Sequence, residues 1–151
     1  MLFRSVRQSV AYGIGIVAEK NREVIAPVLG ESWTVLSQLA SAEDSQEDEN
    51  ALVTQNALSA MGKILQFHSD TIDVASLLPS WVSLLPPPLF VASDEENYET
   101  TVIYKQLCHF ATVFPMALLG EGNQHLPLVL AVFLDALGTS LVAEEIGRAH
   151  V

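Results

Sequence analysis

The stretch that decides the fold is Asn50–His68, with the sequence NALVTQNALSAMGKILQFH. Its apolar residues Ala57, Met61 and Ile64 follow one another at steps of four and three, which places them on one side of an α-helix. The polar residues of the stretch fall on the other side: Gln55, Asn56, Ser59, Lys63 and Gln66. The spacing therefore predicts a helix with one face in a core and the opposite face in solvent.

The same pattern occurs 47 residues earlier, where Val6–Ala18 aligns with Val53–Leu65. The matched pairs include Gln8 with Gln55, Ile14 with Met61, and Gly15 with Gly62. A third copy continues the apolar stripe through Ile103, Leu107 and Phe110. Trp33 and Trp81 recur 48 residues apart in the segments between these helices. A repeat of this length with two helices is typical of HEAT repeats, which stack into α-solenoids.

We therefore predict an all-α fold, a HEAT-repeat α-solenoid fragment in which antiparallel helix hairpins stack into a right-handed superhelix. The array is expected over residues 1–144. It contains the second helix of one repeat at 2–20, one repeat at 23–68, another at 73–114, and the first helix of a further repeat at 124–143. Gly15 and Gly62 are expected where adjacent helices approach most closely.

Both ends of the chain indicate a fragment of a longer protein. Repeat material begins directly after Met1, so the first and last helices are expected to expose apolar faces that neighbouring repeats would cover. Residues 145–151 resemble the translation of a common sequencing-adapter oligonucleotide. We therefore treat them as a non-native tail and leave them out of the functional argument.

The composition favours some partners over others. Eighteen acidic residues face seven basic ones, giving a formal net charge of −11. This charge disfavours nucleic acid and anionic membranes; it either keeps an apolar helical protein soluble or attracts basic partners. The longest apolar run, Leu126–Leu134, is too short to span a bilayer, so we predict no membrane insertion. The single Cys108 allows no internal disulfide.

An acidic loop is predicted between the two helices of the repeat at 23–68. It is a solvated, mobile segment that carries Glu43, Asp44, Glu47, Asp48 and Glu49. These carboxylates either solvate the loop and favour the N-terminus of the next helix or contact a Lys/Arg-rich partner. The later segment Leu89–Ala92 is apolar, and we expect it to pack against the core.

The sequence predicts no enzyme, cofactor or metal site. His68, His109 and His125 share no metal-ligand spacing, and the glycines of Tyr12–Gly15 lie within a predicted helix rather than a phosphate loop. Cys108 is expected to be a buried or half-buried packing residue.

Partner binding is possible on the polar side of Asn50–His68. Asn56 either caps a neighbouring carbonyl or binds an extended partner backbone, while Ser59, Lys63 and Gln66 form either a solvated face or a contact surface. Trp33 and Trp81 are expected to seal the hairpin cores; the alternative is a pair of exposed pockets for Phe-Gly repeats.

Three phrases carry a family resemblance: RQSVAYGIG at 7–15, QNALSAMGKI at 55–64 and LLPSWVSLLP at 77–86. In this order and spacing they resemble the C-terminal HEAT repeats of importin-β-type nuclear transport receptors (karyopherins). The nearest subgroup carries ribosomal proteins and core histones. The resemblance covers about residues 4–135. The acidic loop is longer and more charged than in the family pattern, and Leu85–Phe90 enlarges the interhelix turn.

The resemblance implies a receptor that binds basic protein cargo such as ribosomal proteins or histones, the Ran GTPase and nucleoporin Phe-Gly repeats. Such a receptor shuttles between cytoplasm and nucleus through the nuclear pore. Its second helices, here 2–20, 50–68 and 94–114, line the concave face. A HEAT-repeat scaffold or assembly factor without a transport role is the alternative that the sequence leaves open.

Overall fold

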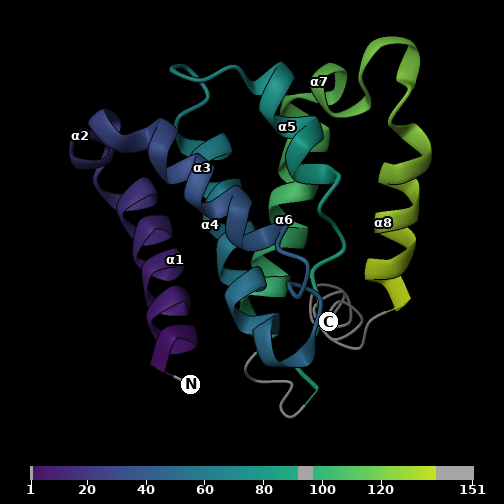
Figure 1. Ribbon diagram of the computed structural model, residues 1–151. Helices are drawn as coiled ribbons and strands as arrows, with labels where there is room; N and C mark the ends of the chain where they lie inside the picture. Colours follow the sequence, from purple (N-terminus) through teal and green to yellow (C-terminus); the bar gives the residue numbers. More distant parts are fainter. Residues whose placement is uncertain (1, 92–96, 139–151) are drawn as a thin grey trace, which may run out of the picture.

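The computed structural model describes residues 2–91 and 97–138, and all regular secondary structure within these ranges is helical. The predicted all-α class is thus confirmed, and the packing is that of a HEAT-like α-solenoid fragment. The main helices are α1 (Leu2–Lys20), α3 (Leu29–Ala40), α4 (Ala51–Phe67), α5 (Val74–Val82), α6 (Tyr98–Val113) and α8 (Leu126–Gly138). Figure 1 shows the chain advancing from α1 on one side to α8 on the other.

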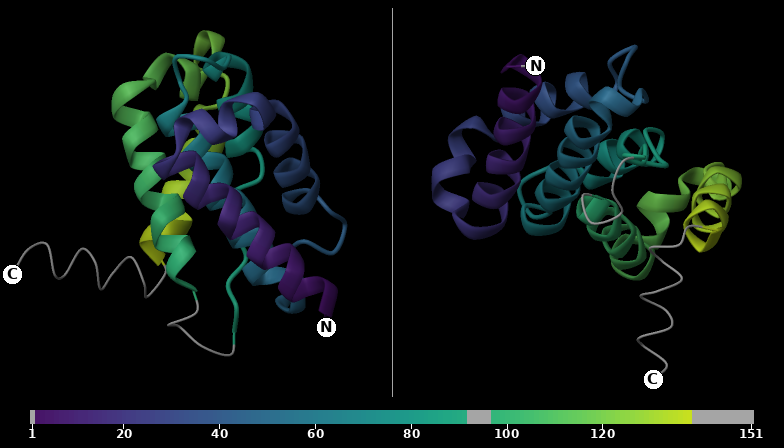
Figure 2. Two further views of the ribbon diagram at one scale, coloured as in Figure 1. Left: turned by 90° about the vertical axis from the view of Figure 1, so that its left-hand side faces the viewer. Right: turned by 90° about the horizontal axis from the view of Figure 1, so that it is seen from below.

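Helix α4 is the centre of this arrangement. It packs along α1 on one side and α6 on the other, and it also contacts α3 and α5. Helices α1, α4 and α6 run in one direction, and α3, α5 and α8 run in the opposite direction (Figures 1 and 2). The hairpins α3/α4 and α5/α6 are therefore antiparallel, and α4 is covered on most of its circumference.

The first half of the repeat predicted at 23–68 is divided into three helical segments. These are α2 (Arg22–Ile25), the 3₁₀ turn η1 (Ala26–Val28) and α3. Pro27 lies in the 3₁₀ turn, where a residue without an N–H is easily accommodated. The side chain of Asn21 caps α2 by accepting a hydrogen bond from the N–H of Val24.

A short helix after α6 was not predicted. Helix α6 ends at Val113, and α7 (Pro115–Leu119) begins directly at the proline, which suits a first helical turn. Gly120 and Gly122 follow with φ of 71° and 62°, a region that favours glycine, and they turn the chain through η4 (Glu121–Asn123) into α8. Ser93 and Glu96 have the spacing of a capping box in the sequence, but both lie outside the described residues. The same is true of the last five residues of the predicted helix at 124–143 and of the tail at 145–151.

The core is sealed by Trp81, as predicted. Its side chain is fully buried, and its indole N–H donates a 2.9 Å hydrogen bond to the carbonyl of Leu58. The ring centroids of Trp81 and Phe110 lie 5.3 Å apart, with the two rings nearly perpendicular. Trp33 is half-buried and packs against the same core. Neither tryptophan therefore forms an exposed pocket.

Successive repeats are joined by hydrogen bonds from side chains to helix carbonyls. Gln106 Nε2 on α6 donates to the carbonyl of Ser59 on α4 at 2.9 Å. His68, just after α4, places Nε2 2.9 Å from the carbonyl of Ala18 on α1. Gly15 permits the close approach of α1 to α4, because a Cβ there would lie 3.2 Å from that of Ala60. The expected role of Gly15 is confirmed.

Apolar faces are exposed at both ends of the array, as expected. On α1 the exposed side chains are Phe3, Val6 and Val10; on α8 they are Leu130, Leu134 and Leu137. The spacings of three and four residues place each set along one side of its helix. Among the described residues, no helix has the length and apolar character needed to cross a membrane.

The loop after α5 differs from the prediction. Leu89 and Val91 are exposed, Val91 to 85%, instead of packing against the core. The side chain of Asn97 holds the backbone of this loop at Phe90. Its Oδ1 accepts a hydrogen bond from the N–H of Phe90 at 2.7 Å, and its Nδ2 donates one to the carbonyl of Phe90 at 2.9 Å. Polar anchoring of the backbone replaces the expected apolar packing.

Candidate protein-binding surfaces

The polar side of α4 is largely buried, so the expected solvent face is wrong for its first half. Asn56 is 6% exposed and Ser59 is 2% exposed. Asn56 Nδ2 donates a 2.7 Å hydrogen bond to the carbonyl of Leu52 in its own helix, one turn earlier. Because neighbouring helices flank α4 on both sides, these polar side chains serve the interior rather than a partner surface.

Gln55 belongs to a buried network that the sequence did not reveal. Its Nε2 donates to the carbonyl of Pro88 at 2.7 Å and to Asn97 Oδ1 at 2.6 Å. Asn97 also holds Phe90, so the start of α4, the start of α6 and the loop between α5 and α6 are tied together. These bonds satisfy the donor group of the fully buried Gln55 side chain, whereas its Oε1 has no hydrogen-bond partner in the described part of the chain.

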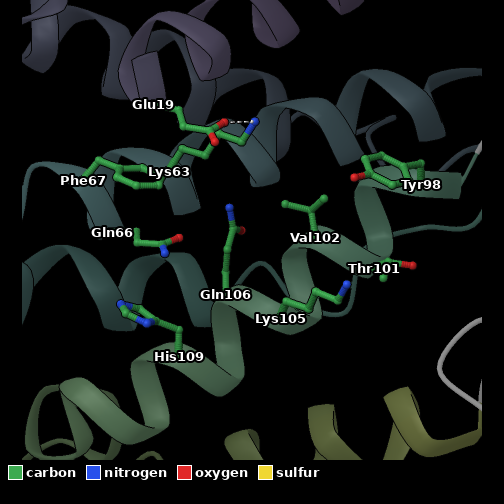
Figure 3. A pocket seen from close by; sticks show the side chains of 10 residues that line it. All are labelled: Glu19, Lys63, Gln66, Phe67, Tyr98, Thr101, Val102, Lys105, Gln106 and His109. Atoms are coloured by element: carbon green, nitrogen blue, oxygen red, sulfur yellow. Dashed lines mark ion pairs between the residues drawn. The ribbon is translucent and has the colours of Figure 1, made fainter. Parts of the chain in front are cut away.

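Lys63 and Gln66 do reach the surface, where they line a groove of about 260 Å³ between α1, α4 and α6 (Figure 3). The lining residues are Glu19, Lys63, Gln66, Phe67, Tyr98, Thr101, Val102, Lys105, Gln106 and His109. Figure 3 shows Gln106 extending from α6 toward the pair formed by Glu19 and Lys63. Of the four α4 residues proposed for partner contact, two therefore remain accessible.

Glu19 holds two lysines at the rim of this groove. Lys63 Nζ lies 3.2 Å from one carboxylate oxygen of Glu19, and Lys20 Nζ lies 3.2 Å from the other. Burial favours the neutral acid, but the hydrogen bonds from Lys63 and then Lys20 outweigh it and lower the pKa of Glu19. The carboxylate is thus ionised and shared at neutral pH.

The acidic loop exposes all five of its carboxylates, Glu43, Asp44, Glu47, Asp48 and Glu49. Its backbone is held by turns, since the N–H groups of Ser45, Glu47 and Asn50 each donate to a carbonyl three residues earlier. The hydroxyl of Thr54 also donates to the carbonyl of Ser45 at 2.7 Å. The loop is therefore a folded turn with a charged outer surface rather than an unstructured tether.

Two further contacts fix the end of the acidic loop. Arg4 on α1 donates to the carbonyl of Glu49 at 2.9 Å, and the N–H of Val91 donates to the carboxylate of Asp48 at 2.8 Å. A hollow of about 270 Å³ adjoins this end, with Leu52 and Phe90 among its lining residues beside Glu49. Carboxylates next to apolar surface suit Lys or Arg side chains, which have an apolar stem and a charged head.

Metal-ligating residue types lie apart from one another in the described part of the chain. No group of three or more His, Cys, Asp or Glu residues in it is arranged to hold a metal ion. Cys108 is exposed rather than packed as predicted, and partial burial of its thiol raises the pKa. A raised pKa reduces the thiolate fraction, which does not favour a nucleophile.

Comparison with known proteins gives a similarity to a curated protein. No family model and no solved structure matches the chain. The chain is 27% identical over 138 residues to a curated protein described as a probable importin-5 homolog from Dictyostelium discoideum. The match covers 88% of this chain but 12% of that protein, so the chain spans a small part of the relative's length. The similarity supports an importin-β-like family.

Proposed function

We propose that this chain is part of a nuclear import receptor of the importin-β type. The supporting observation is the similarity to a probable importin-5 homolog along 88% of the chain, in a fold of stacked helical hairpins. On this proposal the chain contributes to a flexible solenoid that binds basic cargo, responds to Ran-GTP, contacts Phe-Gly repeats and shuttles between cytoplasm and nucleus through the pore. Ribosomal proteins or histones are the proposed cargo class.

The acidic loop is the proposed contact for basic cargo. Its five carboxylates are exposed on a folded turn, and one of them, Glu49, lines a hollow together with Leu52, Phe90 and Arg4. Attraction by exposed charges extends over about 8 to 10 Å at physiological salt, so the loop steers cargo as well as contacting it. Asn56 and Ser59 are excluded from this role by burial, while Lys63 and Gln66 line a separate groove.

The array is proposed to act mechanically. Neighbouring repeats share a core and a few hydrogen bonds between helices, such as those of Gln106 and His68. Small shifts at each such interface change the pitch of the whole solenoid, which couples binding in one region to binding in another.

The first test is binding to Ran by the complete protein that carries this chain. A pull-down with Ran loaded with a GTP analogue is expected to retain the protein and to release a basic cargo. Ran loaded with GDP serves as the control. Failure to bind Ran in either state would contradict the import proposal and favour a HEAT scaffold or assembly factor.

The second test concerns the acidic loop. The triple variant Glu43→Gln/Glu47→Gln/Glu49→Gln is compared with Glu23→Gln/Glu31→Gln/Glu121→Gln, which removes the same charge from exposed sites elsewhere. Because each exposed ion pair contributes about 0.2 to 1 kcal/mol, the loop variant should weaken binding of a histone at least about threefold and flatten its salt dependence. Equal affinities for the two variants would remove the loop from the cargo site.

A further inference from the structure

The end of the acidic loop contacts the repeats on both sides of it. Arg4 Nη1, on α1 in the preceding repeat, donates a 2.9 Å hydrogen bond to the main-chain carbonyl of Glu49. The N–H of Val91, in the loop that leads to α6 in the following repeat, donates a 2.8 Å hydrogen bond to the carboxylate of Asp48. Asp48 and Glu49 are adjacent in the 3₁₀ turn η2 (Asp48–Asn50). One turn of chain therefore connects three successive repeats.

The acidic loop moves with α4, because side chains near the start of that helix anchor it. Thr54, in the first turn of α4, donates a 2.7 Å hydrogen bond to the carbonyl of Ser45, and Asn50 Nδ2 donates one to the carbonyl of Asp44 at 3.2 Å. Ser45 is 6% exposed, so the middle of the loop is packed rather than free. The turn η2 runs directly into α4 at Ala51. A displacement of α1 or of the loop before α6 is therefore transmitted to the start of α4.

The segment that carries Val91 is equally well anchored. Phe90 exchanges two hydrogen bonds with the side chain of Asn97, at 2.7 and 2.9 Å, and Gln55 Nε2 holds the carbonyl of Pro88 at 2.7 Å. The Val91 side chain itself is 85% exposed, so its main-chain N–H rather than apolar packing ties this residue to the acidic loop. Movement of the start of α6 therefore reaches Asp48 through a short chain of hydrogen bonds.

The contact at Asp48 responds to charge. Hydrogen bonds to an ionised carboxylate are stronger than those to a neutral acceptor, and each carboxylate has two oxygens that accept. The five exposed carboxylates of the acidic loop repel one another, whereas Arg4 places one positive charge beside Glu49. A basic partner would reduce this repulsion. It can also pair with the second oxygen of Asp48 without displacing the N–H of Val91, which is bonded to Oδ1.

We propose that the acidic loop is a strap that couples α1 to the start of α6, and that a basic partner bound to its carboxylates stiffens this coupling. The strap itself follows from contacts within this chain and holds for a scaffold as well as for an import receptor. The part played by the partner rests on the proposed function, in which the loop contacts basic cargo. Cargo bound at the loop would then fix the relative positions of three repeats at once.

The strap is tested by hydrogen exchange of the full chain without a partner, followed at single amides by NMR. Arg4→Ala removes the contact to α1, and Asp48→Ala removes the contact to Val91. The matched controls are Arg7→Ala and Glu31→Ala, which remove the same charges from exposed positions on α1 and α3. Loss of the bond to Asp48 should speed exchange of the Val91 N–H about three- to tenfold, whereas the control variants should leave it unchanged.

The decisive readout is at the contact that each variant leaves intact. Arg4→Ala should speed exchange of the Phe90 N–H, and Asp48→Ala should speed exchange of residues 6–10 in α1, each about two- to threefold. Asp48→Asn keeps an oxygen acceptor without its charge, so its effects should lie between those of Asp48→Ala and wild type. The strap is overturned if each variant changes exchange only at its own contact, or if the control variants have the same remote effects.

A labelled peptide of alternating Lys and Ser tests the part played by the partner, with alternating Gly and Ser as the control peptide. At a concentration where fluorescence anisotropy shows saturation, the basic peptide should slow exchange at residues 6–10 and at Phe90 about two- to fivefold in the wild-type chain. In Asp48→Ala it should slow exchange at residues 6–10 alone. A basic peptide that binds without slowing exchange at either segment would overturn the stiffening.

Failure of the basic peptide to bind has a different meaning. It would contradict the cargo contact of the proposed function, and the stiffening with it. The remote effects of Arg4→Ala and Asp48→Ala, which are measured without a partner, would in that case still support the strap.

Discussion

Replacing Gly62 by alanine tests how closely α4 and α6 are packed. A Cβ at this position would overlap the amide group of Gln106, whereas a Cβ on Gly13 would meet nothing within 4 Å. The two glycines lie inside long helices, so alanine gains about 1 kcal/mol of helix propensity at either site. The difference between the two variants therefore isolates the packing at Gly62.

The magnitude follows from what Gln106 loses. Overpacking a close contact costs about 1 to 3 kcal/mol, and loss of the hydrogen bond from Gln106 to the carbonyl of Ser59 costs about 0.5 to 1.5 kcal/mol. After the gain in helix propensity, Gly62→Ala should lower the free energy of unfolding by about 1 to 3 kcal/mol. Gly13→Ala should raise it by about 0.5 to 1 kcal/mol.

Urea denaturation of the full chain, followed by far-ultraviolet circular dichroism, measures both changes. The single variant Gln106→Ala and the double variant Gly62→Ala/Gln106→Ala complete the cycle. The double variant should recover part of the loss, because the shorter side chain at position 106 removes the overlap. A Gly62→Ala protein as stable as the Gly13→Ala protein, or a double variant no better than Gly62→Ala, would refute the packing argument.

Two further predictions concern polar groups. Asn97→Ala removes the hydrogen bonds to Gln55 and to both main-chain groups of Phe90. It should lower the free energy of unfolding in urea by about 2 to 4 kcal/mol and speed proteolysis near Phe90. Tyr98→Ala, at an exposed neighbouring position, is the control. The pKa of Glu19 in the folded protein is lower than the ordinary glutamate pKa of 4.5, so the ionised carboxylate stabilises the fold. This contribution is fully present above pH 4.5 and is lost as the pH falls through the pKa of the folded state. Glu19→Gln should therefore flatten the pH dependence of thermal unfolding below about pH 4.5, and a profile unchanged from wild type would contradict the shared ion pair.

The repeat pattern predicted the fold well because apolar periodicity reports burial directly. The stripe through Met61 and Ile64 is in the core, the helices recur at the predicted places, and Trp81 seals the hairpin. The repeat pattern does not predict the break at Pro27, which lies in a 3₁₀ turn that ends at Val28. A proline restricts φ but does not by itself say which side of it remains helical.

The candidate surface was less predictable because a solenoid helix has neighbours on three sides. Polarity at Asn56 and Ser59 suggested solvent, yet adjacent repeats bury both residues, and Asn56 hydrogen-bonds to the carbonyl of Leu52 in its own helix. The lysines were visible in the sequence, but their spacing of 42 to 43 residues differs from the main period of about 47 by roughly one helical turn. Only the packing of α4 and α6 shows that Lys63 and Lys105 line the same groove, whereas Lys20 contacts its rim through Glu19.

Two of the hydrogen bonds between repeats are asymmetric. Gln106 and His68 engage main-chain carbonyls, at Ser59 and Ala18, which every amino acid supplies. At these two bonds the identity of the side chain therefore matters on only one side, while the other side must keep its spacing. Insertion of one residue into α1 or α4 would move the acceptor by about 1.5 Å along the axis and rotate it by about 100°. Such junctions tolerate substitution but resist changes in helix length, so whole repeats are the natural units of exchange in this array.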